Sequence, residues 1–186
     1  MTVRLTPPGL DRMAEYVAAL ERGWSPNNER DVTGEQLALY RRDPQMLLDE
    51  MTRQDGTIML GSGMLGSGLV VPRLPSRVFW IDDGEISGYL NLRWEPGTDK
   101  LPPHCPGHIG YAVVPWKRRR GYATRALALV LPVAREVGLP RVNITCDADN
   151  EASRRVIVAH RGIFDRCYRT DEGGSKLSFW IDLSVW

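Results

Sequence analysis

Residues 110–137 constrain the fold more than any other part of the chain. The segment begins with an apolar run that ends at Pro115 and continues through a turn with three consecutive arginines at 118–120. From Gly121 the apolar residues recur at helical spacing until Gly138 and Pro140, which are typical stop signals. A strand joined by a tight basic turn to a long helix predicts a domain of packed helices and sheet.

The rest of the chain alternates between the same two patterns. Two N-terminal helices are expected at 10–21 and 34–51, separated by a polar loop at 25–30. The Asp82-Asp83-Gly84-Glu85 stretch predicts a hairpin turn between strands. Further strands and one more helix follow the same rules: strands at 77–81, 86–94, 108–114, 142–146, 163–169 and 176–183, and a helix at 150–160. This order predicts an α/β (α+β) domain with a mixed, mostly antiparallel sheet flanked by helices.

Length and composition set the class of protein. The 186 residues fit a single domain, 1–186. The net charge of +1 produces no overall electrostatic field that would attract nucleic acid or an anionic membrane. No apolar run approaches the roughly 20 residues of a membrane helix. Three widely spaced cysteines without a Cys-x-x-Cys pair argue against a disulfide framework and favour a reducing compartment. We therefore expect a cytoplasmic protein.

A tandem repeat, Met-Leu-Gly-Ser-Gly, occupies residues 59–63 and 64–68. A glycine-rich loop can present backbone N–H groups to phosphate. This one lacks the Lys-Ser/Thr ending of a P-loop, and no helical pattern follows it. We therefore interpret it as a flexible loop and a candidate flap over an acceptor pocket.

The basic turn has the chemistry of an anion site. The first N–H groups of a helix lack intrahelical partners and carry partial positive charge. Gly121 permits close backbone approach, Ala123 keeps the helix start open, and Thr124 offers a hydroxyl. Arg118, Arg119 and Arg120 can neutralise phosphate charge, although an isolated run of arginines is usually a solvated face.

Two motifs resemble those of the GNAT superfamily of N-acetyltransferases. Arg118-x-x-Gly121-x-Ala123 is similar to the pyrophosphate-binding motif of the family, and Asn150-x-Ala152-Ser153 resembles its second cofactor contact. Without the resemblance Asn150 would be only a helix N-cap, and it can serve both purposes. The resemblance covers about residues 80–164. It implies a GNAT-like sheet whose central strands, 107–114 and 142–145, splay apart to admit acetyl-CoA. The implied cofactor contacts are Val113, Val114, Arg118, Arg119, Arg120, Gly121, Tyr122, Ala123, Thr124, Asn150 and Ser153.

The resemblance also implies direct acetyl transfer in a ternary complex, with a backbone N–H near Val113 facing the thioester oxygen. The usual catalytic Glu is replaced by Gly107, so His108 is the predicted general base, with a structural histidine as the alternative. Glu95 is the second candidate base. The usual general-acid Tyr is replaced by Ile157. Either Tyr111 or Tyr168 substitutes for it, or the thiolate leaves with the help of solvent.

These observations predict an acetyl-CoA-dependent N-acetyltransferase acting on a small-molecule or peptide amine. The alternative is an acyl-CoA-binding sensor without catalysis, and a nucleic-acid binder is disfavoured by the low net charge. The donor side is expected mainly at 108–160, and the acceptor side mainly at 1–76 and 163–186. No metal site is expected, because the His104-Cys105-x-x-His108 stretch lacks a fourth ligand. The final hairpin offers an edge for a possible homodimer.

Overall fold

Residues 2–59, 70–170 and 173–186 are described by the structure, which is a computed structural model. The contacts within the chain divide it into two compact units. Unit 1 comprises Met1–Arg53, Arg77–Leu92 and Gly110–Val130, and unit 2 comprises Gln54–Ser76, Arg93–Ile109 and Leu131–Trp186. Most of the Gly-Ser repeat lies outside the described residues, so its predicted role as a flap stays a prediction.

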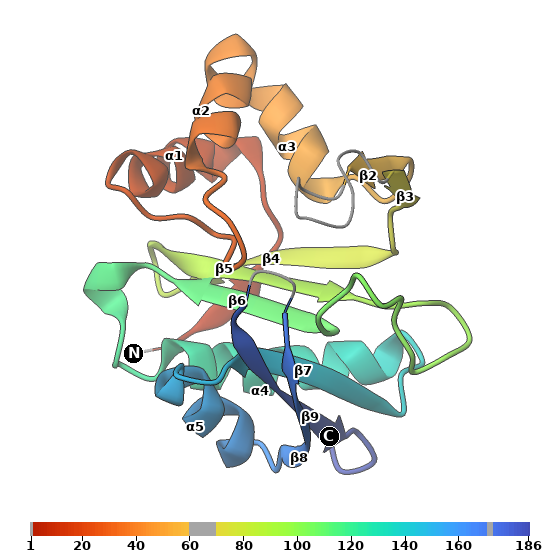
Figure 1. The fold of residues 1–186 in the computed structure, drawn as a ribbon. Coiled ribbons are helices and arrows are strands. Elements are labelled where there is room, and N and C mark those ends of the chain that lie inside the picture. The colour runs from red at the N-terminus through yellow and green to blue at the C-terminus, as the bar shows by residue number, and fades with distance from the viewer. Residues whose placement is uncertain (1, 60–69, 171–172) are drawn as a thin grey trace. The chain divides into compact units, whose positions relative to one another are not determined.

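Three helices, rather than the predicted two, form the N-terminal part of unit 1 (Figure 1). They are α1 (Met13–Glu21), which follows the short 3-10 turn η1 (Leu10–Arg12), α2 (Thr33–Arg42) and α3 (Pro44–Thr52). The expected second helix is divided at Asp43. Asp43 has an extended backbone, its side chain accepts a hydrogen bond from the Gln45 N–H at 2.8 Å, and Pro44 begins the new helix. The prediction of one helix was wrong because an N-cap followed by proline starts a new helix.

The sheet of unit 1 has the strand order β1-β4-β5-β6. Its strands are β1 (Arg4–Thr6), β4 (Ser76–Asp82), β5 (Ile86–Arg93) and β6 (Ile109–Val113). Strand β1 pairs antiparallel with β4. Gly88 on β5 is required by close packing, because a Cβ there would lie 2.4 Å from the Ala112 carbonyl oxygen.

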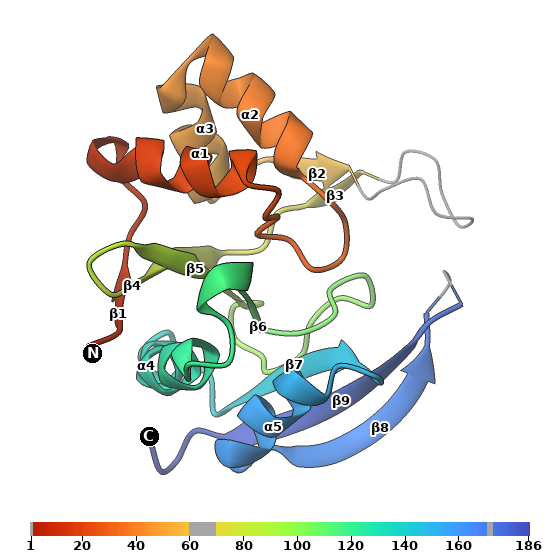
Figure 2. The same cartoon turned by 90° about the vertical axis from the view of Figure 1, so that its left-hand side faces the viewer.

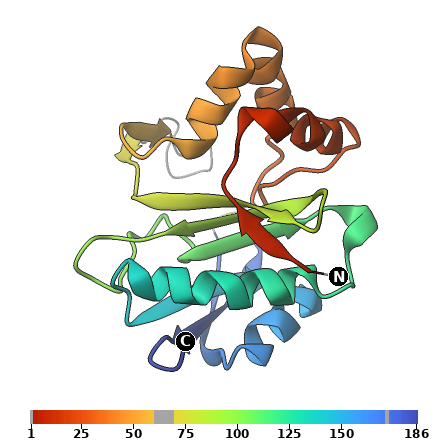
Figure 3. The same ribbon diagram turned by 180° about the vertical axis from the view of Figure 1, so that it is seen from behind.

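The core of unit 1 lies between α1–α3 and one face of this sheet. Tyr16 on α1 is at its centre, stacked on Trp80 of β4 and edge-on to Trp24, with ring centroids 5.6 and 5.7 Å away. The opposite face of the sheet is covered by the first turns of α4 (Tyr122–Glu136), as Figure 3 shows. Ala126, Leu127 and Val130 of α4 are fully buried, which fits the helical spacing of these apolar residues.

Unit 2 contains a second sheet with the order β7-β9-β8 (Figure 2). Its strands are β7 (Arg141–Asp147), β8 (Ile163–Arg169) and β9 (Ser175–Asp182), and β9 pairs antiparallel with both neighbours. Helix α5 (Glu151–Ala159) connects β7 to β8. Strands β2 (Thr57–Met59) and β3 (Val70–Pro72) form a separate antiparallel pair.

These elements confirm the predicted fold class, a mixed α/β domain with mostly antiparallel strands flanked by helices. Strand β6 is an end strand of one sheet and β7 is an end strand of the other. The predicted splay between them stays a prediction. Within the parts of the chain that the structure describes, no helix has the length and hydropathy to cross a membrane.

Candidate functional site

The basic turn, residues 114–121, lies in unit 1 between β6 and α4. The Val114 N–H donates to the Ser87 carbonyl of β5 at 3.0 Å, and the 3-10 turn η2 (Pro115–Lys117) follows. The backbone then contains two left-handed residues: Arg118 is extended, Arg119 has φ = 60°, and Gly121 has φ = 79°. Left-handed residues within such a turn can direct successive N–H groups toward one point, an arrangement called a nest, which binds anions.

Helix α4 begins directly after the turn. The Arg125 N–H donates to the Gly121 carbonyl at 3.0 Å, so the N–H groups of Tyr122, Ala123 and Thr124 precede the first bond of the helix. Ala123 and Thr124 are half-buried, and Gly121 is exposed with open space where a Cβ would stand. The structure thus brings these predicted residues together in one exposed helix N-terminus.

The three arginines of the turn are all exposed. The Arg118 Nε donates to the Val113 carbonyl at 3.1 Å, which holds the end of β6 to the turn. On the same strand the Tyr111 carbonyl accepts from the Asn28 Nδ2 at 2.8 Å. Both carbonyls near the end of β6 are therefore bonded by side chains from other segments of unit 1.

A buried polar cluster, which no sequence motif predicted, lies beneath the turn. It consists of Asp83, Ser87, Lys117 and Tyr122, and we call it the hairpin–turn cluster. The Lys117 Nζ lies 2.8 Å from Asp83 Oδ1 and 3.1 Å from Ser87 Oγ, while the Tyr122 hydroxyl donates to Asp83 Oδ2. Burial opposes ionisation of Asp83, but the hydrogen bonds from Lys117, Tyr122 and Ser87 outweigh it and hold the pKa of this carboxyl well below its usual value.

The cluster changes the interpretation of Tyr122. Its ring is buried within unit 1, and its hydroxyl is bonded to Asp83. The predicted contact of Tyr122 with a cofactor can therefore involve only its backbone N–H. Lys117 was overlooked because a lysine inside a basic run is ordinarily solvated, and Asp83 was overlooked because the acidic turn was fully explained as a hairpin.

Asn150 and Ser153 lie together in unit 2 at the start of α5. The Asn150 Oδ1 accepts from the Ser153 N–H at 3.0 Å, so Asn150 is the N-cap of the helix. Asn150 is exposed and Ser153 is half-buried. The capping role was foreseen from the sequence, and the cofactor contact of both residues stays a prediction.

His108 is fully buried in unit 2. Its backbone N–H donates to the Asn143 carbonyl at 2.8 Å, and the Asn143 N–H donates to its Nδ1 at 2.9 Å. Burial lowers the pKa of the imidazole from 6.5 to about 4. The ring is therefore neutral at pH 7, with its Nδ1 lone pair engaged and its proton on Nε2. This geometry supports the structural alternative, and the role of His108 as general base stays a prediction.

The other candidates for proton transfer are divided between the units. Tyr111 is half-buried on β6 in unit 1. Glu95 is half-buried after β5 in unit 2, and Tyr168 is half-buried on β8, where the Arg166 guanidinium lies 5.8 Å from its ring centre. Their roles as base or acid stay predictions.

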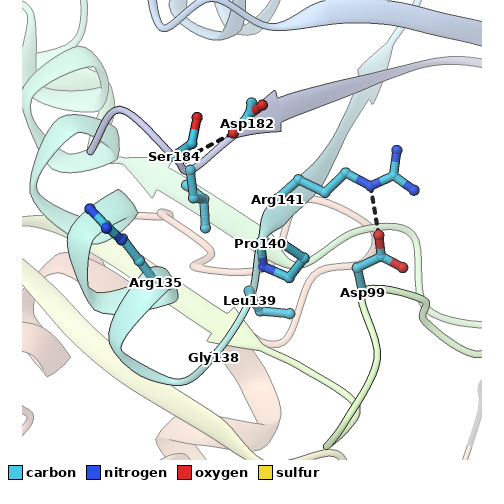
Figure 4. Close-up of a pocket in the computed structure, with 9 residues that line it drawn as sticks. Asp99, Arg135, Gly138, Leu139, Pro140, Arg141, Asp182 and Ser184 are labelled. Carbon is cyan, nitrogen blue, oxygen red and sulfur yellow. Dashed lines mark hydrogen bonds and ion pairs between the residues drawn. The ribbon is translucent and has the colours of Figure 1, made fainter.

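Unit 2 also contains an open pocket of about 590 Å³. It lies where α4 ends, β7 begins and the chain terminates (Figure 4). Its charged groups are largely engaged: the Arg141 Nε lies 2.6 Å from Asp99 Oδ2, and Asp182 accepts from the Ser184 N–H at 2.7 Å. The pocket contains none of the predicted site residues, so the basic turn remains the better candidate site.

Comparison with known proteins agrees with this geometry. The model of the acetyltransferase (GNAT) domain family matches residues 50–160, more than half of the chain. No curated protein sequence matches the chain. The family match over more than half of the chain shows that the protein is an acyltransferase. The chain belongs to the GNAT acetyltransferase family.

Solved structures share the fold at low sequence identity. A complex of RimL, the ribosomal L7/L12 alpha-N-protein acetyltransferase, with coenzyme A has a TM-score of 0.64 at 16% identity, covering 98% of this chain and 94% of that one. The microcin C7 self-immunity acetyltransferase MccE, in complex with acetyl-CoA and AMP, has a TM-score of 0.62 at 12% identity, covering 97% and 92%. A putative ribosomal-protein-serine acetyltransferase from Vibrio cholerae has a TM-score of 0.57 at 16% identity, covering 97% and 93%.

Proposed function

We propose that this acyltransferase moves the acetyl group of acetyl-CoA to a primary amine by direct attack in a ternary complex. The observation that carries the proposal is the basic turn: two left-handed residues, Arg119 and Gly121, precede the exposed N-terminus of α4 in a member of the GNAT family. We propose a single domain over residues 1–186, with the donor side mainly at 108–160 and the acceptor side mainly at 1–76 and 163–186.

The donor would be held chiefly by backbone groups of the turn. The N–H groups from Gly121 to Thr124 and the partial positive charge of the helix start suit the pyrophosphate, and Arg118 and Arg120 add exposed cations. Asn150 and Ser153 would contact the pantetheine arm. RimL and MccE have been crystallised with coenzyme A and acetyl-CoA, respectively, which supports this choice of donor.

The chemistry requires few protein groups. The neutral amine nitrogen attacks the thioester carbon, the C–S bond breaks, and the coenzyme leaves as a thiolate while the amine gives up a proton. A backbone N–H near Val113 would stabilise the oxyanion. Holding both substrates in one complex supplies much of the rate acceleration, because the attack becomes effectively unimolecular.

The acceptor is a small-molecule or peptide amine. RimL acts on a ribosomal protein, so a peptide α-amine belongs in the tested panel. The experiment is a thiol-release assay with acetyl-CoA and a panel of peptide, amino-acid and polyamine acceptors. Acceptor-dependent thiol release confirms transfer, whereas tight acetyl-CoA binding without turnover for any acceptor would favour the sensor alternative.

Neutralising Arg120 should weaken acetyl-CoA binding by about 1–3 kcal/mol, because a charge-assisted hydrogen bond to phosphate would be lost. The measurement is isothermal titration calorimetry of Arg120→Ala, repeated at several salt concentrations. Arg42→Ala, which removes an exposed arginine at the end of α2, is the matched control and should leave the affinity unchanged. A loss of only a few tenths of a kcal/mol for Arg120→Ala would restore the solvated-face interpretation.

Asn150→Ala should raise the KM for acetyl-CoA, and the rise should be larger than the loss of the helix cap alone would cause. Loss of the N-cap alone costs about 1 kcal/mol of folding free energy. Asp43→Ala is the matched control, because Asp43 caps α3 through the same kind of side-chain bond and lies outside the predicted donor site. Steady-state kinetics and thermal melts of both variants separate the two roles. If the melting temperature falls equally in both variants and the KM for acetyl-CoA is unchanged in both, Asn150 has only a structural role.

A further inference from the structure

We propose that Asp83 and Lys117 are positioning residues, which hold the basic turn in the backbone conformation that binds the pyrophosphate of acetyl-CoA. The inference rests on the proposed function of the turn. Neither residue reaches the exposed surface where the ligand would lie. Their role is to connect the turn to the hairpin between β4 and β5.

The first observation is that one carboxylate bridges the two residues that flank 118–121, the second half of the turn. Asp83 Oδ1 is bonded to Lys117, directly before the three arginines, and Asp83 Oδ2 is bonded to Tyr122, directly after Gly121. The four residues between these anchors include both left-handed residues of the turn. Because both ends are fixed to one side chain, the conformation of the short segment between them is restricted.

The second observation is that the hairpin is itself held in place. The Asp83 N–H donates to the Glu85 carbonyl at 3.2 Å, and the Gly84 N–H donates to Asp82 Oδ1 at 2.7 Å. Asp82 is buried and lies 2.7 Å from the Arg12 guanidinium. The hairpin that carries Asp83 is therefore held by its own hydrogen bonds and by the ion pair between Arg12 and Asp82.

The third observation is that the ion pair is buried and costly. The side chains of Lys117 and Asp83 are each 11% exposed. Desolvation of two charges offsets much of their attraction, so a buried pair contributes little to stability compared with apolar residues of similar size. A pair at this position is better explained by the fixed geometry that it gives the turn than by overall stability.

An electrostatic argument predicts the opposite result, which makes the proposal testable. Acetyl-CoA is an anion, and a negative charge beneath its binding site should repel it. If charge alone mattered, Asp83→Asn would bind acetyl-CoA more tightly. If Asp83 positions the turn, the same variant binds more weakly, because Lys117 and Tyr122 lose their common partner.

Glu85→Gln is the matched control. The Glu85 carboxylate lies 3.0 Å from the same Lys117 Nζ, but its side chain is 79% exposed. The variant removes one negative charge near the turn without removing the bridge. Its affinity for acetyl-CoA should stay within about twofold of the wild type, because exposed ion pairs contribute little.

The experiment measures acetyl-CoA binding by calorimetry and steady-state KM and kcat for both substrates. Asp83→Asn should weaken acetyl-CoA binding about tenfold and raise its KM similarly, with kcat and the amine KM nearly unchanged. If Asp83→Asn does not fold, the double variant Asp83→Asn/Lys117→Met removes the unpaired charge and should show the same loss. Unchanged or tighter binding by a folded variant overturns the inference. Failure of the wild type to bind acetyl-CoA would instead overturn the proposed function.

Discussion

Replacing Gly121 with valine is expected to weaken acetyl-CoA binding by at least about 100-fold, because two effects act in the same direction. Gly121 has φ = 79°, a conformation that a β-branched residue adopts only under strain. The position of its missing Cβ is open, with no atom beyond the adjacent residues within 4 Å, so an added Cβ would not clash with other parts of the protein. The added side chain would instead occupy the space next to the N–H groups that are proposed to bind the pyrophosphate.

Gly138→Val separates the effect on the site from the effect on the backbone. Gly138 follows α4, has φ = 92°, and also has no atom within 4 Å of an added Cβ. Both variants should lose roughly 1–3 kcal/mol of stability, because the strain is similar. Calorimetric titration of both should show loss of acetyl-CoA binding for Gly121→Val alone. Equal affinities for two folded variants would exclude the turn as the donor site.

Acidification from pH 6.5 to 4 is expected to remove about 3 kcal/mol of unfolding free energy through His108 alone. Burial lowers the pKa of His108 in the folded protein to about 4, whereas the unfolded chain has the ordinary value of 6.5. Between these values the unfolded chain binds a proton that the folded protein does not. The stabilising contribution is therefore fully present above pH 6.5 and is lost as the pH falls through 4.

His108→Gln provides the comparison. Glutamine does not titrate, so the unfolding free energy of the variant, measured with denaturant, should fall by about 3 kcal/mol less than that of the wild type across this range. A pH dependence identical to that of the wild type would show that His108 is not the buried neutral group described above.

The same variant decides whether His108 is also the general base. A base role predicts a fall in turnover of about 10²–10⁴-fold with unchanged acetyl-CoA affinity. The acid limb of the rate profile would also reflect the ionisation of His108. Turnover within a few-fold of the wild type would assign the imidazole to structure, and Glu95 would be tested next.

Local sequence signals predicted the features that depend on near neighbours. The cap at Asn150 was predictable because capping involves residues a few positions apart. Gly121 was predicted to allow close backbone approach, and its left-handed conformation became known from the structure. The break at Asp43 was visible in the sequence as an Asp-Pro pair, which favours a new helix start, but residues 34–51 were predicted as one helix.

Features that depend on distant pairs were not predictable. Lys117 and Asp83 are 34 positions apart, and neither residue type suggests burial by itself. The environment of His108 similarly depends on Asn143, 35 positions away on another strand. Composition and periodicity carry no information about which charges meet across a fold.

The left-handed backbone at Arg119 has a consequence for protein engineering. A non-glycine residue at φ = 60° stores roughly 1 kcal/mol of strain, which glycine would relieve and asparagine would reduce. Neither replacement retains a cation beside the proposed phosphate site. Selection of a library randomised at position 119 for heat resistance would therefore enrich glycine and asparagine. Selection for binding of acetyl-CoA at low concentration would keep lysine and arginine.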